Sequence, residues 1–418
     1  MKWEYINAEE YCESVRDGTH DTPKPTEKGY KLVTGKHIKN GQIDPNDAYY
    51  ISEKDYNKIN ERSLVEQWDV LMSMIGTVGE VAVVRDSPDY AIKNVALFKC
   101  GGSELKGKWL AYYLKSSEAQ GHMTGNQKGS SQQFLSLKQL RSLPVPVTDE
   151  KNMQKTICFL SAYDDLIENN QKQIKLLEEA AQRLYKEWFV DLRFPGYENT
   201  TVVDGVPQGW RKVSLSELIE YEIGGDWGED QPTEKCDLPA YVIRGTDLYD
   251  VTHGNAKSIP YRFHAKGNLD SRKLQDGDIV FEVSGGSKNE GVARTALITE
   301  SLIDFLGGDV ICASFCKLIR FKDKSSAKYM YDTFQYLRNS GETVKYDKRS
   351  ASSIVNYRWK DFLEQQFIFI PTSDILTQYN TLAETMQKVI VNKAQIIEQA
   401  KQARDRLLPK LMSGELEV

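Results

Sequence analysis

The chain has 418 residues, more than one hydrophobic core usually supports, so its length predicts at least two domains. Hydrophobic residues make up 40% and charged residues 27%, the balance of a soluble globular protein. A formal net charge of −6 argues against a protein that coats nucleic acid with its whole surface, although local basic faces remain open.

Cysteines, histidines and apolar runs bear on location and metal binding. The six cysteines are scattered, with no CxxC pair and no histidine at zinc spacing. No apolar run reaches the roughly 18 residues of a membrane span, and the N-terminus lacks the apolar core of a signal peptide. We therefore predict a cytoplasmic protein with reduced thiols, no membrane contact and no structural metal.

The predicted elements follow one order twice along the chain. The matching segments are Trp3 with Trp210, 29–33 with 240–244, 69–79 with 278–286, 94–98 with 312–316, 129–131 with 349–353, and 143–146 with 368–371. The spacing between the copies grows along the chain, as insertions in surface loops would produce. The sequence therefore predicts two similar globular domains.

Each copy mixes short strands with helices. Runs rich in β-branched and aromatic residues, such as 81–84 and 367–370, alternate with Gly- and Asn-rich turns and predict a curled sheet. Helices are predicted over 108–117 and 327–339. The predicted fold class is α+β.

Each copy then ends in a helix with seam residues at 3-4 spacing. The first seam is Leu160, Tyr163, Ile167, Asn170, Ile174, Leu177, Ala181, Leu184 and Trp188; the second is Tyr379, Leu382, Met386, Val389, Lys393, Ile396, Ala400, Ala403 and Leu407. Four heptads in each favour an antiparallel coiled coil between the two helices. Two helices that each pack on their own domain remain the alternative.

Two seam positions are polar, namely Asn170 and Lys393, and such residues can fix the register of a coiled coil at some cost in stability. At 1.5 Å per residue, each seam is about 43 Å long. We expect a globular domain at each end.

Proline and glycine mark the boundaries. Phe194-Pro195-Gly196 ends the first helical segment, and Pro207 to Trp210 opens the second domain. The predicted organisation is a first domain at 1–147, a spacer helix at 148–193, a second domain at 194–371, and a second spacer helix with the C-terminal tail at 372–418.

Motifs that would carry catalysis are incomplete. Gly102 to Trp109 lacks the Ser or Thr that holds Mg²⁺ in a phosphate-binding loop. Asp89, Glu104 and Lys106 imitate a metal-dependent nuclease pattern, but the second copy has no counterpart. No methyltransferase, serine hydrolase or zinc protease motif is present. We predict no catalytic centre in this chain.

Basic loops rich in small polar residues recur in both copies and favour contact with double-stranded DNA, since Lys and Arg neutralise phosphates while Ser and Gln approach base edges. The candidate residues are Lys36, Lys128, Gly129, Ser130, Ser131, Gln133, Arg244, Ser287, Lys288, Lys348, Arg349, Ser350 and Ser352. The acidic segment 222–237 is expected to face away from DNA or toward a protein partner.

Several segments resemble the specificity subunits of type I restriction-modification systems, and the resemblance covers essentially the whole chain. They are LPVP at 143–146, the helix exit KEWFVDLRFPG at 186–196, the ending LLPKLMSGELEV at 407–418, PQGW at 207–210 and the glycine turn GTVG at 76–79. Glu80 departs from the pattern, because a basic residue would suit DNA better after that turn.

The resemblance implies two target recognition domains that each read half of a bipartite DNA site, with the helices as the ruler between them. It implies partners: two methyltransferase subunits that use S-adenosylmethionine and two motor-nuclease subunits that use ATP and Mg²⁺. This chain would bind no cofactor itself. The ruler of about 43 Å is close to the repeat of roughly 34–36 Å that sets two readers on one face of DNA.

Two other functions remain open. The chain could be a stand-alone nuclease or methyltransferase, which assays of the purified chain would reveal. It could also be a coiled-coil adaptor without a DNA role, in which case charge reversal at Lys128, Lys348 and Arg349 would leave DNA affinity unchanged.

Overall fold

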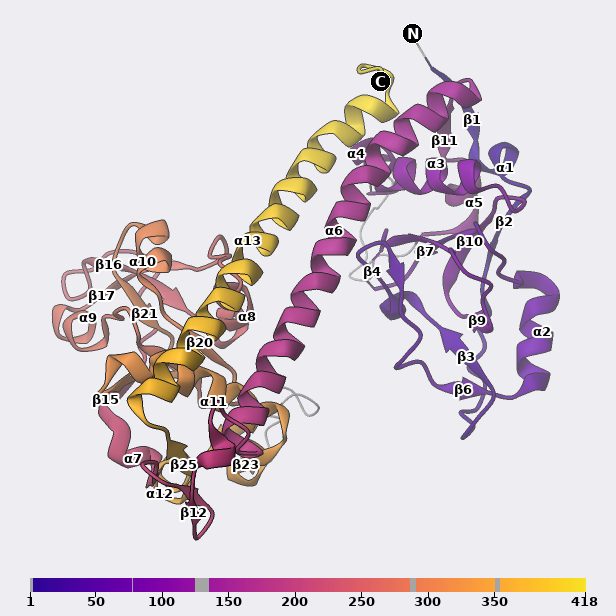
Figure 1. The fold of residues 1–418 in the computed structure, drawn as a ribbon. Coiled ribbons are helices and arrows are strands. Elements are labelled where there is room, and N and C mark those ends of the chain that lie inside the picture. Colours follow the sequence, from indigo (N-terminus) through magenta and orange to yellow (C-terminus); the bar gives the residue numbers. More distant parts are fainter. Residues whose placement is uncertain (1–2, 77, 125–134, 286–290, 350–353) are drawn as a thin grey trace. The chain divides into compact units, whose positions relative to one another are not determined.

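The computed structural model describes all residues except 1–2, 77, 125–134, 286–290 and 350–353 (Figure 1). The chain divides into two compact units, one formed by residues 1–167 with 399–418 and the other by residues 168–398. Each unit combines a mixed domain with parts of two long helices, α6 (Glu150–Tyr185) and α13 (Ser373–Met412). The predicted α+β class with two similar domains and two long helices is confirmed.

The first unit is built on small sheets. Its sheets are β2 (Ser14–Asp17), β10 (Val95–Lys99), β7 (Val70–Ser73) and β8 (Val81–Val83); β6 (Tyr50–Ile51), β3 (Tyr30–Val33) and β9 (Tyr90–Ile92); β1 (Glu4–Asn7) with β11 (Pro144–Val147); and β4 (Ile38–Lys39) with β5 (Gln42–Ile43). Its helices are α1 (Ala8–Tyr11), η1 (Gly35–His37), α2 (Glu53–Ser63), α3 (Glu104–Lys115), α4 (Ser117–Thr124) and α5 (Leu137–Arg141).

The described part of the second unit has counterparts of three of these sheets, but not of β4-β5, and two sheets of its own. They are β15 (Ile219–Gly224), β22 (Cys316–Phe321), β18 (Ile279–Glu282) and β20 (Thr295–Leu297); β17 (Tyr261–His264), β16 (Leu238–Ile243) and β21 (Val310–Cys312); β14 (Arg211–Ser214) with β25 (Phe367–Ile370); β19 (Ser284–Gly285), β24 (Val355–Tyr357) and β23 (Asp347–Arg349); and β12 (Val202–Val203) with β13 (Val206–Pro207). The helices are η2 (Lys186–Val190), η3 (Tyr197–Asn199), α7 (Leu215–Leu218), η4 (Gly245–Asp247), α8 (Leu248–Thr252), α9 (Lys266–Arg272), α10 (Glu300–Leu306), η5 (Lys324–Ser326), α11 (Ala327–Asn339), η6 (Glu342–Tyr346) and α12 (Trp359–Gln365).

Strand order is the same in the two domains, which confirms the duplication. The four-stranded sheets run β2-β10-β7-β8 and β15-β22-β18-β20. In the three-stranded sheets β6-β3-β9 and β17-β16-β21, the central strand pairs in parallel with β9 or β21. One predicted match was wrong: β10 corresponds to β22, so residues 95–99 match 316–321 and not 312–316. Residues 312–315 instead hold the end of β21 and a turn, whose apolar composition imitates a strand, and Cys316 begins β22.

A buried ion pair is repeated at the start of the equivalent strands. Lys99 Nζ lies 2.6 Å from Asp69 Oδ2, and Arg320 donates to both carboxylate oxygens of Asp278 at 2.8 and 2.7 Å. The two aspartates directly precede β7 and β18 and are almost fully buried. Removing the cation would leave a buried carboxylate without its counter-charge, which is destabilising.

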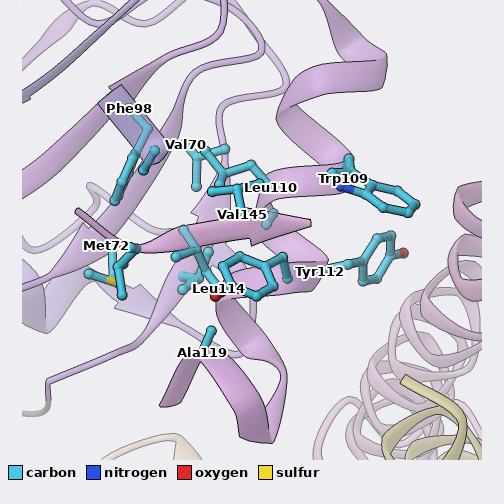
Figure 2. Packing of buried hydrophobic residues seen from close by; sticks show 14 of the residues in the cluster. Val70, Met72, Phe98, Trp109, Leu110, Tyr112, Leu114, Ala119 and Val145 are labelled. Carbon is cyan, nitrogen blue, oxygen red and sulfur yellow. The ribbon is translucent and has the colours of Figure 1, made fainter. Parts of the chain in front are cut away.

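The first core packs α3 against the four-stranded sheet and β11 (Figure 2). Val70, Met72 and Phe98 of the sheet meet Leu110 of α3 and Val145 of β11. The indole of Trp109 donates to the carbonyl of Pro146 at 2.7 Å. Helix α3 begins at Glu104, earlier than the predicted Lys108, because the Ser103 hydroxyl accepts from the backbone N–H of Lys106 and caps it. Helix α11 has the predicted bounds.

The two long helices are antiparallel within each unit. In the first unit Arg404 of α13 donates to Asp164 of α6 at 2.7 Å. In the second unit Lys393 Nζ donates to Asn170 Oδ1 at 3.4 Å, while the ring of Tyr379 lies 6.3 Å from that of Tyr185. Among the residues that the structure describes, no helix is long and apolar enough to cross a membrane.

The seam predicted for α13 needs correction at two positions. Leu382 and Val389 are 45% and 39% exposed, whereas their neighbours Ala383 and Ile390 are buried. At both places two apolar residues are adjacent in the sequence, so a 4-3 spacing fits the pattern as well as the predicted 3-4 spacing. A shift by one residue rotates the buried face of the helix by about 100°.

The remaining predicted seam residues are described as follows. Leu160, Ile167, Asn170, Ile174, Trp188, Tyr379 and Ala400 are buried, and Tyr163, Leu177, Ala181, Leu184, Met386, Lys393, Ile396, Ala403 and Leu407 are half-buried.

Candidate DNA interface

Two of the predicted DNA segments converge on one sheet of the second domain. Gly285 of β19 and Arg349 of β23 both pair with Val355 of the central strand β24, from opposite sides. The predicted residues Ser287, Lys288, Ser350 and Ser352 follow these strands and lie outside the described residues. The β19-β24-β23 sheet therefore brings together two segments that are far apart in the sequence.

One face of this sheet is polar and open. The register places Ser284 opposite Asn356 and Asn356 opposite Lys348, and the Ser284 hydroxyl donates to Asn356 Oδ1 at 2.9 Å. Asn356 and Lys348 are exposed, whereas Val355 and Tyr357, which alternate with Asn356, are buried. We call Ser284, Asn356 and Lys348 the polar row.

An ion pair holds the residues directly before strand β19. Glu282 is buried, and its carboxylate accepts two hydrogen bonds from Arg294, at 2.8 and 2.5 Å. Gly285 has a φ of +128°, which favours glycine, and a Cβ there would lie 3.2 Å from Glu282 Oε1. An ion pair with a buried carboxylate thus holds the backbone directly before β19.

Asp347 lies in β23 beside the polar row. Its Oδ2 atom is buried without a hydrogen bond to the described part of the chain, and burial raises the pKa of this carboxyl despite the nearby Arg349.

Arg244, predicted to bind DNA, is engaged within its own domain. Its Nε and Nη2 atoms donate to Asp247 at 2.8 and 2.7 Å, and Nη2 also donates to the carbonyl of Ser258 at 3.1 Å. These bonds to Asp247 raise the pKa of Arg244 and close the 3-10 turn η4. The structure gives this guanidinium a folding role and leaves its DNA contact a prediction.

The first domain has the corresponding arrangement around its glycine turn. Leu135 N donates to the carbonyl of Met74 at 3.3 Å, as Tyr357 N donates to that of Val283 at 2.9 Å in the second domain. Gln120 Nε2 donates to the carbonyl of Gly79 at 3.4 Å. The predicted residues Lys128, Gly129, Ser130, Ser131 and Gln133 fall between α4 and Leu135 and lie outside the described residues.

Lys36 lies next to that turn. A Cβ on the preceding Gly35 would come within 3.2 Å of Ser73 Cβ and 3.5 Å of the Ile75 carbonyl oxygen, so η1 touches the strand that leads into the turn. Lys36 Nζ is 3.4 Å from Asp47, and both side chains are exposed, so solvent screens this ion pair. A phosphate could compete with so weak a partner.

The acidic residues near both interfaces are held by their own domains. Glu80, which departs from the family pattern, accepts from the Asn40 backbone at 3.2 Å. In the acidic segment 222–237, Glu222 pairs with Lys317 at 2.6 Å, Asp226 with His264 at 2.8 Å, and Asp230 with Arg262. These carboxylates stabilise the fold locally. No group of three metal-binding side chains was found among the described residues.

Comparison with known proteins finds the following similarities. Residues 1–179 match the model of the type I restriction modification DNA specificity domain. The chain is 24% identical over 400 residues to the type I restriction enzyme MjaIX specificity subunit of Methanocaldococcus jannaschii, covering 88% of this chain and 84% of that protein. It is 25% identical over 175 residues to the EcoBI specificity subunit of Escherichia coli, covering 38% and 37%.

A solved structure has a similar fold. The S subunit of a type I restriction-modification system from M. genitalium superposes with a TM-score of 0.53 at 13% identity, covering 98% of this chain and 96% of that one. At this identity the likeness supports the fold alone.

Proposed function

We propose that each domain reads one half of a bipartite site in double-stranded DNA. The match of residues 1–179 to the type I restriction modification DNA specificity domain and the chain's resemblance to type I specificity subunits support this proposal. The observation that carries the proposal is the convergence of the predicted segments on one sheet of the second domain, with the corresponding segments of the first domain around its glycine turn.

The proposal includes partner subunits. Two methyltransferase subunits would dock on this chain and modify adenine with S-adenosylmethionine, and two motor-nuclease subunits would use ATP and Mg²⁺. The chain itself would bind no cofactor, carry no catalytic residue and act in the cytoplasm. Apolar side chains that the seam leaves exposed support docking on the long helices: Leu176 is 64% exposed, and Leu382 and Val389 also face outward.

Modification-sensitive sequencing tests the proposal. Cells that carry this chain with its methyltransferase partner should contain methyladenine in one two-part motif. Replacing residues 1–147 by the corresponding segment of a related subunit should change one half of the motif and leave the other half intact. An unchanged motif after the exchange would contradict the assignment, and so would Mg²⁺-dependent DNA cleavage by the purified chain alone that is abolished by Asp89→Ala.

A further inference from the structure

We propose that Asn356 reads a base edge in the DNA half-site of the second domain, with Ser284 orienting its amide and Lys348 holding a phosphate beside it. This inference rests on the proposed function and goes further by assigning a specificity-determining residue. Asn356 was not among the residues predicted from the sequence.

The first step is the position of Asn356 on a rigid element. It lies in the central strand of a three-stranded sheet, and its neighbours Val355 and Tyr357 are buried on the opposite face. The backbone N–H of Tyr357 is fixed to the Val283 carbonyl at 2.9 Å. A reading side chain on a packed strand keeps its place better than one on a loop, as discrimination between bases requires.

The second step is the orientation of the amide. The Ser284 hydroxyl donates to Oδ1 at 2.9 Å, so the oxygen end of the Asn356 amide lies toward Ser284. Its NH₂ group makes no hydrogen bond to the described part of the chain, and the residue is exposed. The amide therefore offers two donors and a second oxygen lone pair to a ligand.

The third step is the chemistry of the ligand. An asparagine amide matches adenine in the major groove, where it donates to N7 and accepts from N6. Lys348 stands directly opposite Asn356 in the ladder and is exposed, so it can neutralise the neighbouring phosphate. An adjacent amide and ammonium on one face suit a base edge next to its backbone.

The test uses the chain assembled with its methyltransferase partner, and it compares DNA duplexes that differ at single positions of the motif. Asn356→Ala should lower discrimination at one position of the second half-site by about 10- to 100-fold, leaving the first half-site unchanged. Asn392→Ala, at an exposed asparagine of α13, is the matched control and should change nothing. Equal thermal midpoints would establish that both variants fold.

Two further variants separate the roles within the polar row. Ser284→Ala should weaken discrimination at the same position by a smaller factor. Lys348→Ala should weaken binding of all sequences alike and reduce the salt dependence of the affinity by about one phosphate contact.

The outcomes distinguish this inference from the proposed function. A wild-type complex that modifies a bipartite motif, together with an Asn356→Ala complex of unchanged discrimination, overturns this inference alone. Uniform weakening by Asn356→Ala across all sequences overturns it as well, since that would make Asn356 a backbone contact. A wild-type complex with no bipartite motif overturns the proposed function and this inference with it.

Discussion

The two domains share strand order and a buried carboxylate at the same place, but they fill the space beside their spacer helix differently. Trp68 and Gly277 each precede that carboxylate, and both have left-handed backbone, with φ of +71° and +91°. Trp68 lines a cavity of about 140 Å³ against α6, whereas Gly277 lines one of about 1010 Å³ against α13. At this turn the first domain has a tryptophan with left-handed backbone, whereas the second domain has a glycine beside an open groove.

In both units a tyrosine donates a hydrogen bond to a carboxylate between a long helix and its domain. The tyrosine belongs to the domain in the first unit and to the helix in the second. In the first unit Tyr112 of the domain donates to Asp164 of α6 at 2.7 Å, and Arg404 neutralises the carboxylate. In the second unit Tyr379 of α13 donates to Asp332 of the domain at 2.7 Å, and Lys328 is the cation. A tyrosine, a carboxylate and a cation are retained, although the residues come from different elements.

The largest expected effect follows from the different burial of the cations in these two clusters of tyrosine, carboxylate and cation. Asp332→Ala leaves Lys328 almost fully buried without its counter-charge and should destabilise the second unit by about 3–5 kcal/mol. Asp164→Ala, whose partner Arg404 is more exposed, should cost clearly less in the first unit. Urea unfolding of both variants measures the two losses, and the exposed Asp165→Ala is the control. Equal losses would contradict the ranking.

A smaller effect tests the left-handed position itself. Gly277→Ala places a Cβ at φ +91° and within 3.0 Å of Lys324 Cγ, which should cost roughly 1–2 kcal/mol. Gly267→Ala in helix α9, where a Cβ meets nothing within 4 Å, should not destabilise the same unit. Thermal unfolding midpoints provide the comparison, and matching midpoints for the two variants would show that the backbone at Gly277 is not restricted.

The smallest effect depends on pH and concerns a contact of the second unit. Burial lowers the pKa of His253, but its 3.0 Å hydrogen bond to Glu178 of α6 and the bond to the Tyr249 carbonyl outweigh burial and raise it. The resulting stabilisation is fully present below the unfolded pKa of about 6.5 and is lost as pH rises through the folded pKa.

The advantage of the wild type over His253→Gln should therefore shrink between acidic and alkaline pH. Thermal midpoints across that range measure it, with Glu178→Gln as a second variant that should behave alike. A constant difference between wild type and variant would exclude this origin.

Sequence patterns predicted the order of elements well because strand alternation and caps are local properties. Helix α11 and strand β25 have their predicted bounds, and the twin domains follow from the repeated order. The register of α13 could not be chosen, since Leu382-Ala383 and Val389-Ile390 offer apolar residues on two adjacent faces. Which face is buried depends on the partner helix.

The candidate interface was predicted in part. Lys348 and Arg349 are exposed at a shared sheet, but no sequence pattern predicted that Arg244 is bound to Asp247. Asn356 was missed although Val355-Asn356-Tyr357 alternates apolar and polar residues, a pattern that predicts one outward side chain on a strand. Its pairing with Ser284 joins segments about 70 residues apart, beyond the reach of a local pattern.

Residues near the C-terminus pack in the first domain. Leu408, Leu411 and Met412 lie in the hydrophobic core of the first domain, and Gly414 packs so closely on Trp3 that a Cβ there would collide with the indole. Recombination between related genes is therefore constrained. An exchange of all residues after 194 also replaces part of the first domain's hydrophobic core. Such an exchange preserves the first reader only when the incoming segment carries a compatible ending.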